Sequence, residues 1–486
     1  MRDDEQTERP AETCALSWPE QRRNLILFAL CTGMQYMMAP VLYVGITQAS
    51  LCNRLGGDAR LSNLPATLYF AMTAMPALLA WLSPQVVKLR RNLSLCYGIS
   101  GLMMGWIALV LVLPVEPSWQ IAAVVIQGGV AGALMPAAIA LLWEAIGRGS
   151  SESHRGLALS LAFGLGPLLA VVGSFGQTAL LGGNLFGWQF PGLSFPNGFV
   201  ILFGMGVPMM AISATLAWGF IIPPEAVDVR RESVRDVAGL LLGLPLMGLS
   251  LILVSASEAE RVTWQSLLGY LAGLAATAAF LHYFRTLLSQ RVLLLATLVT
   301  ILVYAGNVIP SNMNLYSSEA LGDSPEKFAG VQNMLRFSFK VVAGLFLGWL
   351  LMKTNPRTGI LATSLIFLCS QIWAFVMTGP WYLVAFGLHG AGELVGVYAP
   401  NYMVSASRRA DLRKNMAFVT MLMVPAAPAG YLYGAIVDNV KAAGWTLGGM
   451  SSEMLGFRIS FLVCGLLIIT GIVLALVSLP PRPRPE

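Results

Sequence analysis

Hydrophobic residues along this chain come in blocks of about 20, and short polar segments separate the blocks. A block of that length, wound as an α-helix, crosses the roughly 30 Å hydrocarbon core of a bilayer. The ten-residue alternation of apolar and polar residues that marks a membrane β-barrel does not occur in the sequence. The pattern therefore predicts an all-α polytopic membrane protein.

The blocks fall into groups of six, two and six, which predicts 14 transmembrane helices. The first six lie near 24–48, 63–83, 93–113, 118–146, 156–182 and 197–222. Two more lie near 236–255 and 264–284. The last six lie near 292–314, 328–352, 358–378, 381–405, 414–437 and 456–479. We expect two six-helix bundles with two extra helices between them.

This order predicts five regions. They are an N-terminal arm (1–23), an N-terminal bundle (24–222), a linker with the two extra helices (223–290), a C-terminal bundle (291–479) and a C-terminal tail (480–486). The linker helices contain few polar residues, so we expect them to face lipid outside the bundles and to take no part in binding.

Composition and charge agree with a membrane protein. Of 486 residues only 11% are charged and 56% are hydrophobic, whereas soluble domains carry about 25% charged residues. Most of the 30 lysines and arginines fall in segments that the 14-helix layout places on the side of both termini. Cytoplasmic loops are enriched in these residues, so both termini are predicted to be cytoplasmic in a bacterial inner membrane. The net charge of +6 is then topological, and no nucleic-acid partner is expected.

The second group of six blocks repeats features of the first. At an offset of 268 residues Tyr36 falls on Tyr304, and at an offset of 264 residues 132–136 fall on 396–400, each segment ending in proline. Ordered matches at a slowly drifting offset are typical of duplicated transporter halves. The two bundles are therefore expected to be related by a pseudo-two-fold axis.

The six-two-six arrangement resembles the fourteen-helix branch of the major facilitator superfamily. Residues 124–131 resemble the RxxQGxGA pattern of that family, with Val124 in place of its proton-coupling arginine. Residues 162–170 are similar to the antiporter GxxxGPxxG pattern and keep Gly166 and Pro167. The loop at 80–91 occupies the place of the family's gating loop but has Pro84 at the acidic position.

This resemblance implies a secondary active transporter that works by alternating access, of the drug or metabolite antiporter type with degenerate motifs. We expect proton-coupled export of a small organic solute by a monomer surrounded by membrane lipid. An importer of an organic anion is the alternative within the same class. A non-transporting receptor or scaffold that keeps the fold is the alternative from another class.

Other kinds of chemistry have little support in the sequence. No phosphate loop of the form GxxxxGK[ST] occurs, no HExxH or CxxC spacing occurs, and the three histidines lie far apart in the chain. We therefore expect no enzymatic activity, no cofactor and no metal site.

Charged residues inside the predicted helices are the strongest candidates for function. Gln332, Arg336 and Lys340 are spaced four apart and share one helix face, and His389 and Glu393 have the same spacing. A cation at a helix centre costs about 2.5 to 3.5 kcal/mol on insertion scales, so such residues face a partner or a cavity. In one hypothesis Gln332, Arg336 and Lys340 bind an anionic or zwitterionic substrate, and His389 and Glu393 couple its transport to protons. The other hypothesis is a buried structural salt bridge.

Further polar and aromatic residues at similar depth could complete a substrate site, although each could equally form an interhelical hydrogen bond. They are Gln35, Tyr36, Gln127, Tyr304 and Asn307.

Gating is predicted where proline or glycine disturbs a helix, because proline removes a backbone hydrogen bond. The residues concerned are Gly166, Pro167, Pro425 and Pro428. Near the inner end of the fourth block, Glu144 is predicted to pair with Arg148 one turn later.

Overall fold

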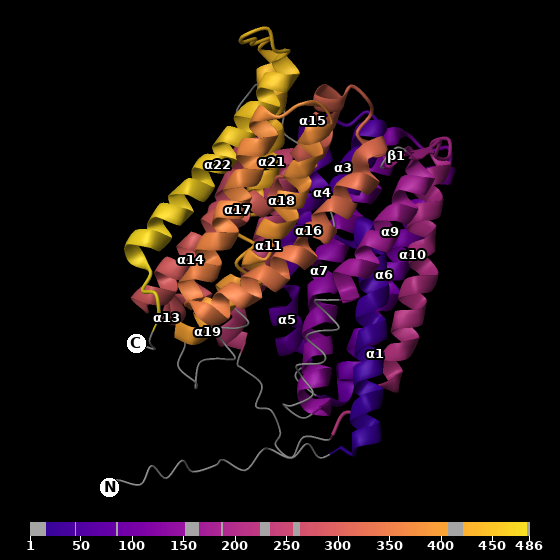
Figure 1. The fold of residues 1–486 in the computed structure, drawn as a ribbon. Helices are drawn as coiled ribbons and strands as arrows, with labels where there is room; N and C mark the ends of the chain where they lie inside the picture. Colours follow the sequence, from indigo (N-terminus) through magenta and orange to yellow (C-terminus); the bar gives the residue numbers. More distant parts are fainter. Residues whose placement is uncertain are drawn as a thin grey trace.

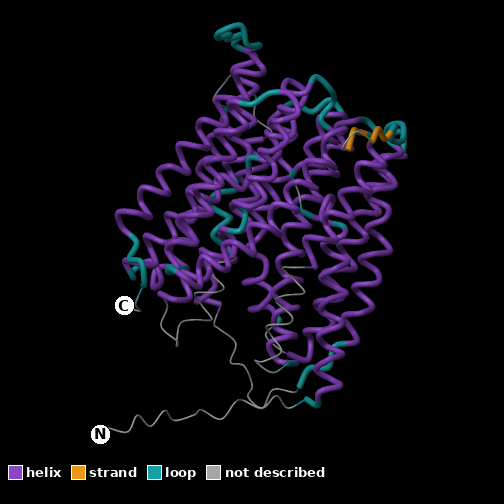
Figure 2. The backbone as a smooth tube through the Cα atoms, in the orientation of Figure 1, coloured by secondary structure: helices purple, strands orange, loops and turns teal. Residues whose placement is uncertain are grey.

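A computed structural model describes residues 16–43, 45–83, 86–150, 165–185, 188–223, 234–255, 263–406 and 421–483. Most of the N-terminal arm, Pro84 of the predicted gating loop and the first three residues of the 162–170 pattern lie outside the described residues. Nearly all the described chain is helical (Figures 1 and 2).

Elements up to residue 223 make up the first half of the molecule. Its helices are α1 (Trp18–Met37), α2 (Ala39–Leu42), α3 (Ile46–Arg54), α4 (Ala59–Ala71), α5 (Met75–Leu82), α6 (Leu89–Val112), α7 (Pro117–Gly149), α9 (Gly166–Leu181) and α10 (Asn197–Leu216). A short hairpin follows α9, in which β1 (Gly183–Leu185) pairs antiparallel with β2 (Trp188–Phe190) and Gly183 lies opposite Phe190.

Two helices come next, α11 (Val234–Ser255) and α12 (Trp264–Tyr283), in the predicted linker. The second half of the molecule begins with α13 (Arg285–Leu288). It continues with α14 (Arg291–Tyr304), α15 (Pro310–Leu321), α16 (Glu326–Lys353), α17 (Pro356–Val376), α18 (Val384–Gly392), α19 (Val395–Ala406), α21 (Pro428–Ala442) and α22 (Ser452–Ser478).

The helices form a multi-pass membrane protein. Eight helical segments among the described residues are long and apolar enough to cross a bilayer. Their outer faces carry large apolar side chains, such as Leu345 on α16 and Val477 on α22, which are 75% and 81% exposed. Apolar surface in such quantity requires lipid as its solvent.

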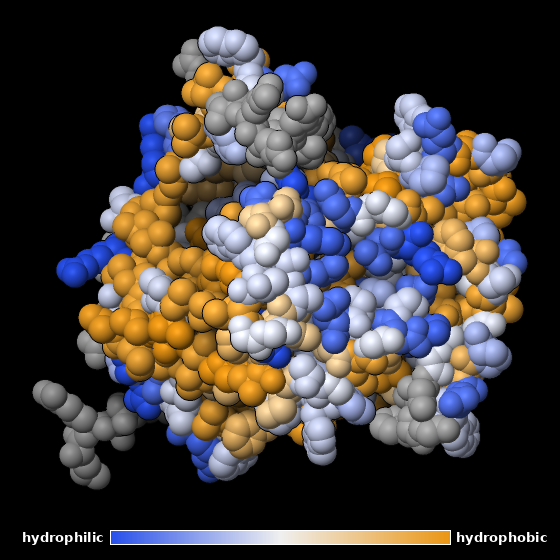
Figure 3. Space-filling view, turned by 90° about the horizontal axis from the view of Figure 1, so that it is seen from above, coloured by the Kyte–Doolittle hydropathy of each residue, from blue (hydrophilic) through white to orange (hydrophobic). Residues whose placement is uncertain are grey.

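The two ends of the molecule differ. The described termini lie at the lower end in Figure 1, here called the terminal end, and β1 lies at the upper end, here called the hairpin end. Seen from the hairpin end, hydrophilic residues gather over the middle and hydrophobic residues lie along much of the margin (Figure 3). This distribution fits an end that emerges from the membrane.

Two large hydrophobic cores stabilise the fold. One consists only of first-half residues, among them Phe28, Tyr97 and Phe203. The other is built mainly by the second half. It also includes Leu240 of α11 and Phe280 of α12 from the linker, and Phe70 of α4 from the first half. One face of the pair thus packs on protein, with α11 in contact with α4, whereas large apolar side chains elsewhere on it, such as Leu274 of α12, are 68% exposed. That the pair lies outside the bundles and takes no part in binding stays a prediction.

The first span is broken between α1 and α3, and polar side chains satisfy the backbone groups that the break releases. Thr47 donates to the carbonyl of Pro40, and Gln48 donates to the carbonyl of Val41 at 2.8 Å. Gln127 of α7 donates to the same Val41 carbonyl at 3.1 Å. The break is thus held by side chains of two helices.

Among the residues that the structure describes, contacts between the halves are concentrated at the hairpin end. There α16 packs against α9 and α3, α15 packs against α3, and α21 packs against α4. At the terminal end α19 packs against α14 and α17 of its own half, and α5 packs against α7 of its own half. The molecule is therefore closed at the hairpin end.

An interhelical cap contributes to this closure. Asp438 of α21 accepts hydrogen bonds from the backbone N–H groups of Ala59 and Arg60, at 3.1 and 2.9 Å, and from Nε of Arg60 at 3.1 Å. Asp58 caps the same first turn of α4 from within its own half by accepting from the N–H of Leu61 at 2.8 Å. The orphan donors at a helix N-terminus favour carboxylates, so Asp438 caps α4 across the two halves.

Candidate functional site

A cluster of charged residues forms the candidate site. Nε of Arg336 donates to Oε1 of Glu393 at 2.8 Å, and a second guanidinium nitrogen contacts the same oxygen. Nζ of Lys340 donates to Oε2 of Glu393 at 2.9 Å. Nε2 of His389 lies 3.6 Å from Oε1. Both carboxylate oxygens are therefore engaged by cations, and with a neutral histidine the cluster carries one net positive charge.

The cluster is buried, with a graded exposure. The side chains of His389, Glu393 and Arg336 are 0%, 5% and 10% exposed, whereas that of Lys340 is 22% exposed. A buried charge without a partner costs several kcal/mol, so pairing is what permits these groups at this depth. Lys340 is therefore the most exposed member of the cluster.

Helix geometry brings the charges together. Arg336 and Lys340 lie one turn apart on α16, and Glu393 lies in the break between α18 and α19. Gly390 of α18 packs directly on the Arg336 backbone, where a Cβ atom would overlap the carbonyl group. The glycine thus sets the close approach of the two helices. Irregular backbone at membrane depth is tolerated where it lies within the protein or lines a site, and it is typical of transporter sites.

Aromatic rings connect the cluster to the first half. The ring of Phe337 lies 5.6 Å from the guanidinium carbon of Arg336 and 5.8 Å from Nζ of Lys340. Tyr36 of α1 meets Phe337 edge to face, with centroids 6.5 Å apart. The charged cluster therefore lies at the interface between the halves.

A small cavity lies beside Tyr36, between α1 and α7. Its volume is about 90 Å³. It is lined by Phe28, Thr32, Gln35, Tyr36, Tyr43, Ile139, Leu142 and Trp143. The lining consists mainly of aromatic and aliphatic side chains and includes no charged residue.

Three predicted substrate residues are engaged in hydrogen bonds of the scaffold. Gln127 supports the break after α2, as described above. Gln332 accepts from Asn314 at 2.7 Å and donates to Ser317 at 2.6 Å, both on α15. Gln35 donates to Tyr43 at 3.2 Å. The spacing that places Gln332 in line with the two cations therefore does not bring it to Glu393.

The other two predicted substrate residues, Tyr304 and Asn307, lie at the end of α14 and in the turn that follows it. Tyr304 ends α14, and its hydroxyl lies 3.6 Å from the position of a Cβ atom on Gly396, near the helix break. Asn307 is buried in the following 3₁₀ turn, and its Oδ1 has no hydrogen-bond partner among the described residues. Contact with a solute remains a prediction for both.

The predicted gating positions coincide with irregular or tight backbone. Before α21, the N–H group of each donor residue bonds to the carbonyl three residues earlier, as Ala427 N–H does to the Val424 carbonyl at 3.2 Å, and α21 itself begins at Pro428. Pro425 lies within this segment. At the start of α9, Gly166 packs on the ring of Tyr36 and is followed by Pro167. A role of these residues in gating stays a prediction.

Several residues of interest escaped the sequence reasoning. The interhelical cap formed by Asp438 and Arg60 joins positions 378 residues apart. The cavity residues Phe28, Thr32 and Trp143 look like ordinary core residues in the sequence. The only available signal was that Asp438 directly follows the block 414–437, while Arg60 lies just before the block 63–83.

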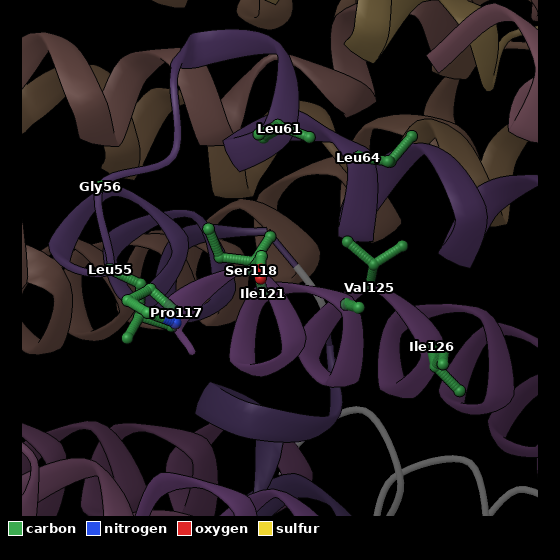
Figure 4. Close-up of a pocket in the computed structure, with 10 residues that line it drawn as sticks. Leu55, Gly56, Leu61, Leu64, Pro117, Ser118, Ile121, Val125 and Ile126 are labelled. Atoms are coloured by element: carbon green, nitrogen blue, oxygen red, sulfur yellow. The ribbon is translucent and has the colours of Figure 1, made fainter. Parts of the chain in front are cut away.

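A larger cavity, of about 560 Å³, lies elsewhere, where α7 begins and α3 meets α4 (Figure 4). It is lined by Leu55, Gly56, Leu61, Leu64, Pro117, Ser118, Ile121, Ala122, Val125 and Ile126. These residues belong to the first half and none is charged, so the cavity supplies no chemistry for the site.

Comparisons with known proteins establish the fold. No protein-family model matches the chain, and no curated protein matches it. A bacterial homologue of the human drug peptide transporters is 14% identical, with a TM-score of 0.61 over 94% of this chain and 97% of that chain. A nucleoside transporter is 11% identical, with a TM-score of 0.60 over 93% of this chain and 99% of that transporter. A D-xylose–proton symporter is 14% identical, with a TM-score of 0.60 over 94% and 98%.

Proposed function

We infer from the transporter fold of the major facilitator type that the protein is a secondary active transporter, and that it moves a small organic anion across the bacterial inner membrane. The bundles predicted at 24–222 and 291–479 alternate in access to the site, with both termini in the cytoplasm. The closure at the hairpin end and the separate packing of α5 and α19 at the terminal end support an inward-facing state.

The observation that carries this proposal is the carboxylate of Glu393 held between Arg336 and Lys340 in a helix break. An incoming carboxylate can replace that of Glu393 as the partner of the two cations. Once the solute holds both cations, Glu393 is a buried carboxylate without a partner, and its desolvation favours the protonated form. Glu393 therefore takes up a proton as the solute binds, and the net charge of the cluster stays at plus one.

His389 is the candidate group for delivering that proton. It lies one helical turn before Glu393, its Nε2 is 3.6 Å from Oε1, and its ring packs on Phe367 with centroids 5.1 Å apart. A neutral imidazole can accept a proton on one nitrogen and donate it to a carboxylate.

Direction follows from this coupling. A solute anion that binds together with a proton is cotransported, and an inward proton gradient then drives it into the cell. The cluster thus favours the importer of an organic anion over the exporter. Export rests on the resemblance of 162–170 to an antiporter pattern, of which only 165–170 lie among the described residues.

The experiment uses purified protein in vesicles that contain a pH-reporting dye, with a panel of organic anions, with and without an apolar group, added outside. Anion-dependent proton entry and counterflow of a radiolabelled anion are expected for the wild type. Lys340→Met should abolish both, because it removes the accessible cation. Lys353→Met, at the exposed end of the same helix, is the matched control and should retain flux.

The alternatives give other results. A receptor or scaffold with this fold would bind an anion without counterflow. A purely structural ion cluster would give Lys340→Met a lowered melting temperature with unchanged flux in the protein that remains folded. Either outcome would refute the proposed function.

A further inference from the structure

We propose that the cavity between α1 and α7 receives the apolar body of the transported anion, so that the solute is a monoanion with one flat hydrophobic group. This inference rests on the proposed function, which places the charged end of the solute at Arg336 and Lys340. It adds a second subsite, in the other half of the molecule, and with it a class of substrate.

The walls of the cavity are suited to a flat apolar group. Phe28 and Trp143 lie with ring centroids 5.1 Å apart and planes tilted by 60°. Tyr36 and Tyr43 lie 5.8 Å apart at 62°. Rings in tilted and edge-to-face arrangements present both faces and edges to the cavity, which favours a further aromatic ring packed against them. Leu142 adds an aliphatic wall.

Tyr36 joins this cavity to the charged cluster. It lines the cavity, and it meets Phe337 edge to face at 6.5 Å. Phe337 in turn lies beneath both cations, 5.6 Å from Arg336 and 5.8 Å from Lys340. A solute with its carboxylate at Lys340 and its ring beside Tyr36 would therefore bridge the two halves, as a solute of an alternating-access transporter must.

The polar groups of the cavity narrow the class of solute. Gln35 donates to Tyr43 at 3.2 Å and accepts from Tyr97 at 3.5 Å, so its amide is already engaged. Thr32 is buried, and its hydroxyl has no hydrogen-bond partner among the described residues. One polar substituent on the solute could bond Thr32. A sugar or nucleoside needs many more partners than this cavity offers.

The charges decide between a simple anion and a zwitterion. No acidic residue lines the cavity, so an ammonium group would have no partner there. Glu393 is the acidic member of the cluster, and in the proposed function it is protonated when the solute binds, so it offers no negative charge to an ammonium group. A cationic group on the solute would therefore lie unpaired beside two cations. The geometry favours a monoanion over an amino acid or peptide.

The test measures binding to the purified full-length protein in lipid nanodiscs by titration calorimetry with three probes. Benzoate carries both the ring and the charge, acetate carries only the charge, and benzyl alcohol carries only the ring. Benzoate is expected to bind at least about tenfold more tightly than acetate, because burial of the ring contributes to its affinity. Benzyl alcohol should bind most weakly, because it lacks the carboxylate.

Two variants assign the effect to the cavity. Trp143→Leu keeps an apolar wall but removes the ring, and it should weaken benzoate binding about tenfold while leaving acetate binding unchanged. Retained acetate binding also reports that the variant is folded. Trp119→Leu is the matched control on the same helix, where Trp119 is 69% exposed, and it should bind both anions like the wild type. Thr32→Val removes the unpartnered hydroxyl, so it should weaken the binding of 4-hydroxybenzoate relative to that of benzoate.

The inference is overturned if benzoate and acetate bind equally, or if Trp143→Leu behaves like Trp119→Leu. Neither of those results touches the proposed function, provided that Lys340→Met abolishes binding of both anions. Conversely, the proposed anion site itself fails if Lys340→Met leaves the binding of acetate and benzoate unaltered, or if neither anion binds the wild type.

Discussion

The cap that Asp438 forms on α4 is expected to set the balance between the closed and open states of the hairpin end. Asp438→Ala removes three hydrogen bonds that cross the two halves, two from backbone N–H groups and one from Arg60. A hydrogen bond to a charged group is worth about 1.5 to 3 kcal/mol. Water can replace part of this, since the side chains of Arg60 and Asp438 are 21% and 12% exposed. We expect a net loss of about 2 kcal/mol, or an approximately 30-fold shift toward the open state.

The measurement uses a cysteine placed at Ser318, which lines a hairpin-end cavity of about 310 Å³ that also includes Asp438. Its rate of reaction with a bulky maleimide, in nanodiscs, reports the fraction of time that this end is open. Asp58→Ala provides the matched control. Asp58 caps the same helix from within its own half, so its removal costs the closed and the open state the same hydrogen bond. Equal labelling rates in the two variants would refute the idea that Asp438 holds the halves together.

Three further predictions address the site and the scaffold. Glu393→Gln mimics the protonated carboxyl group, so anion counterflow should persist while a pH gradient no longer drives accumulation; gradient-driven uptake in this variant would contradict the coupling role. Gly390→Ala forces α18 away from α16 and should lower the stability by about 1 to 3 kcal/mol in thermal unfolding, whereas Gly98→Ala, which has open space around it, should not. Gln127→Leu leaves the Val41 carbonyl with one donor fewer and should lower the melting temperature without altering which anions are bound.

Local spacing made part of this site predictable. Glu144 and Arg148 lie one turn apart on one helix, and the predicted ion pair is confirmed at 2.8 Å. The same rule placed Arg336 and Lys340 on one face of their helix. A charge in hydrocarbon needs a partner or a cavity, and the ion pairs of these cations with Glu393 agree with the salt bridge that was one of the two hypotheses. Membrane character and helical fold class followed from block length alone.

The other parts depend on tertiary geometry that no local pattern encodes. The break between α1 and α3 exposes backbone carbonyls, and it is this break that recruits Gln127, which the sequence indicated as a solute contact. Gln332 has the spacing of the cations but turns to Asn314 on α15. How closely α18 approaches α16 is set by Gly390, and a glycine in an apolar block does not reveal which helix it will meet.

Uncharged amides and hydroxyls make up much of the seam at the hairpin end. Asn333 donates to Gln177 at 3.0 Å, and Ser50 donates to Asn314 at 2.7 Å, all of them buried. None of these groups titrates near neutral pH, and buried dipoles are little affected by dissolved salt. Bonds of this kind are insensitive to acidity. Protons therefore act on the outer closure through its charged members, such as the Asp438 carboxylate that caps α4, while the amides and hydroxyls of the seam keep the same charge at every physiological pH.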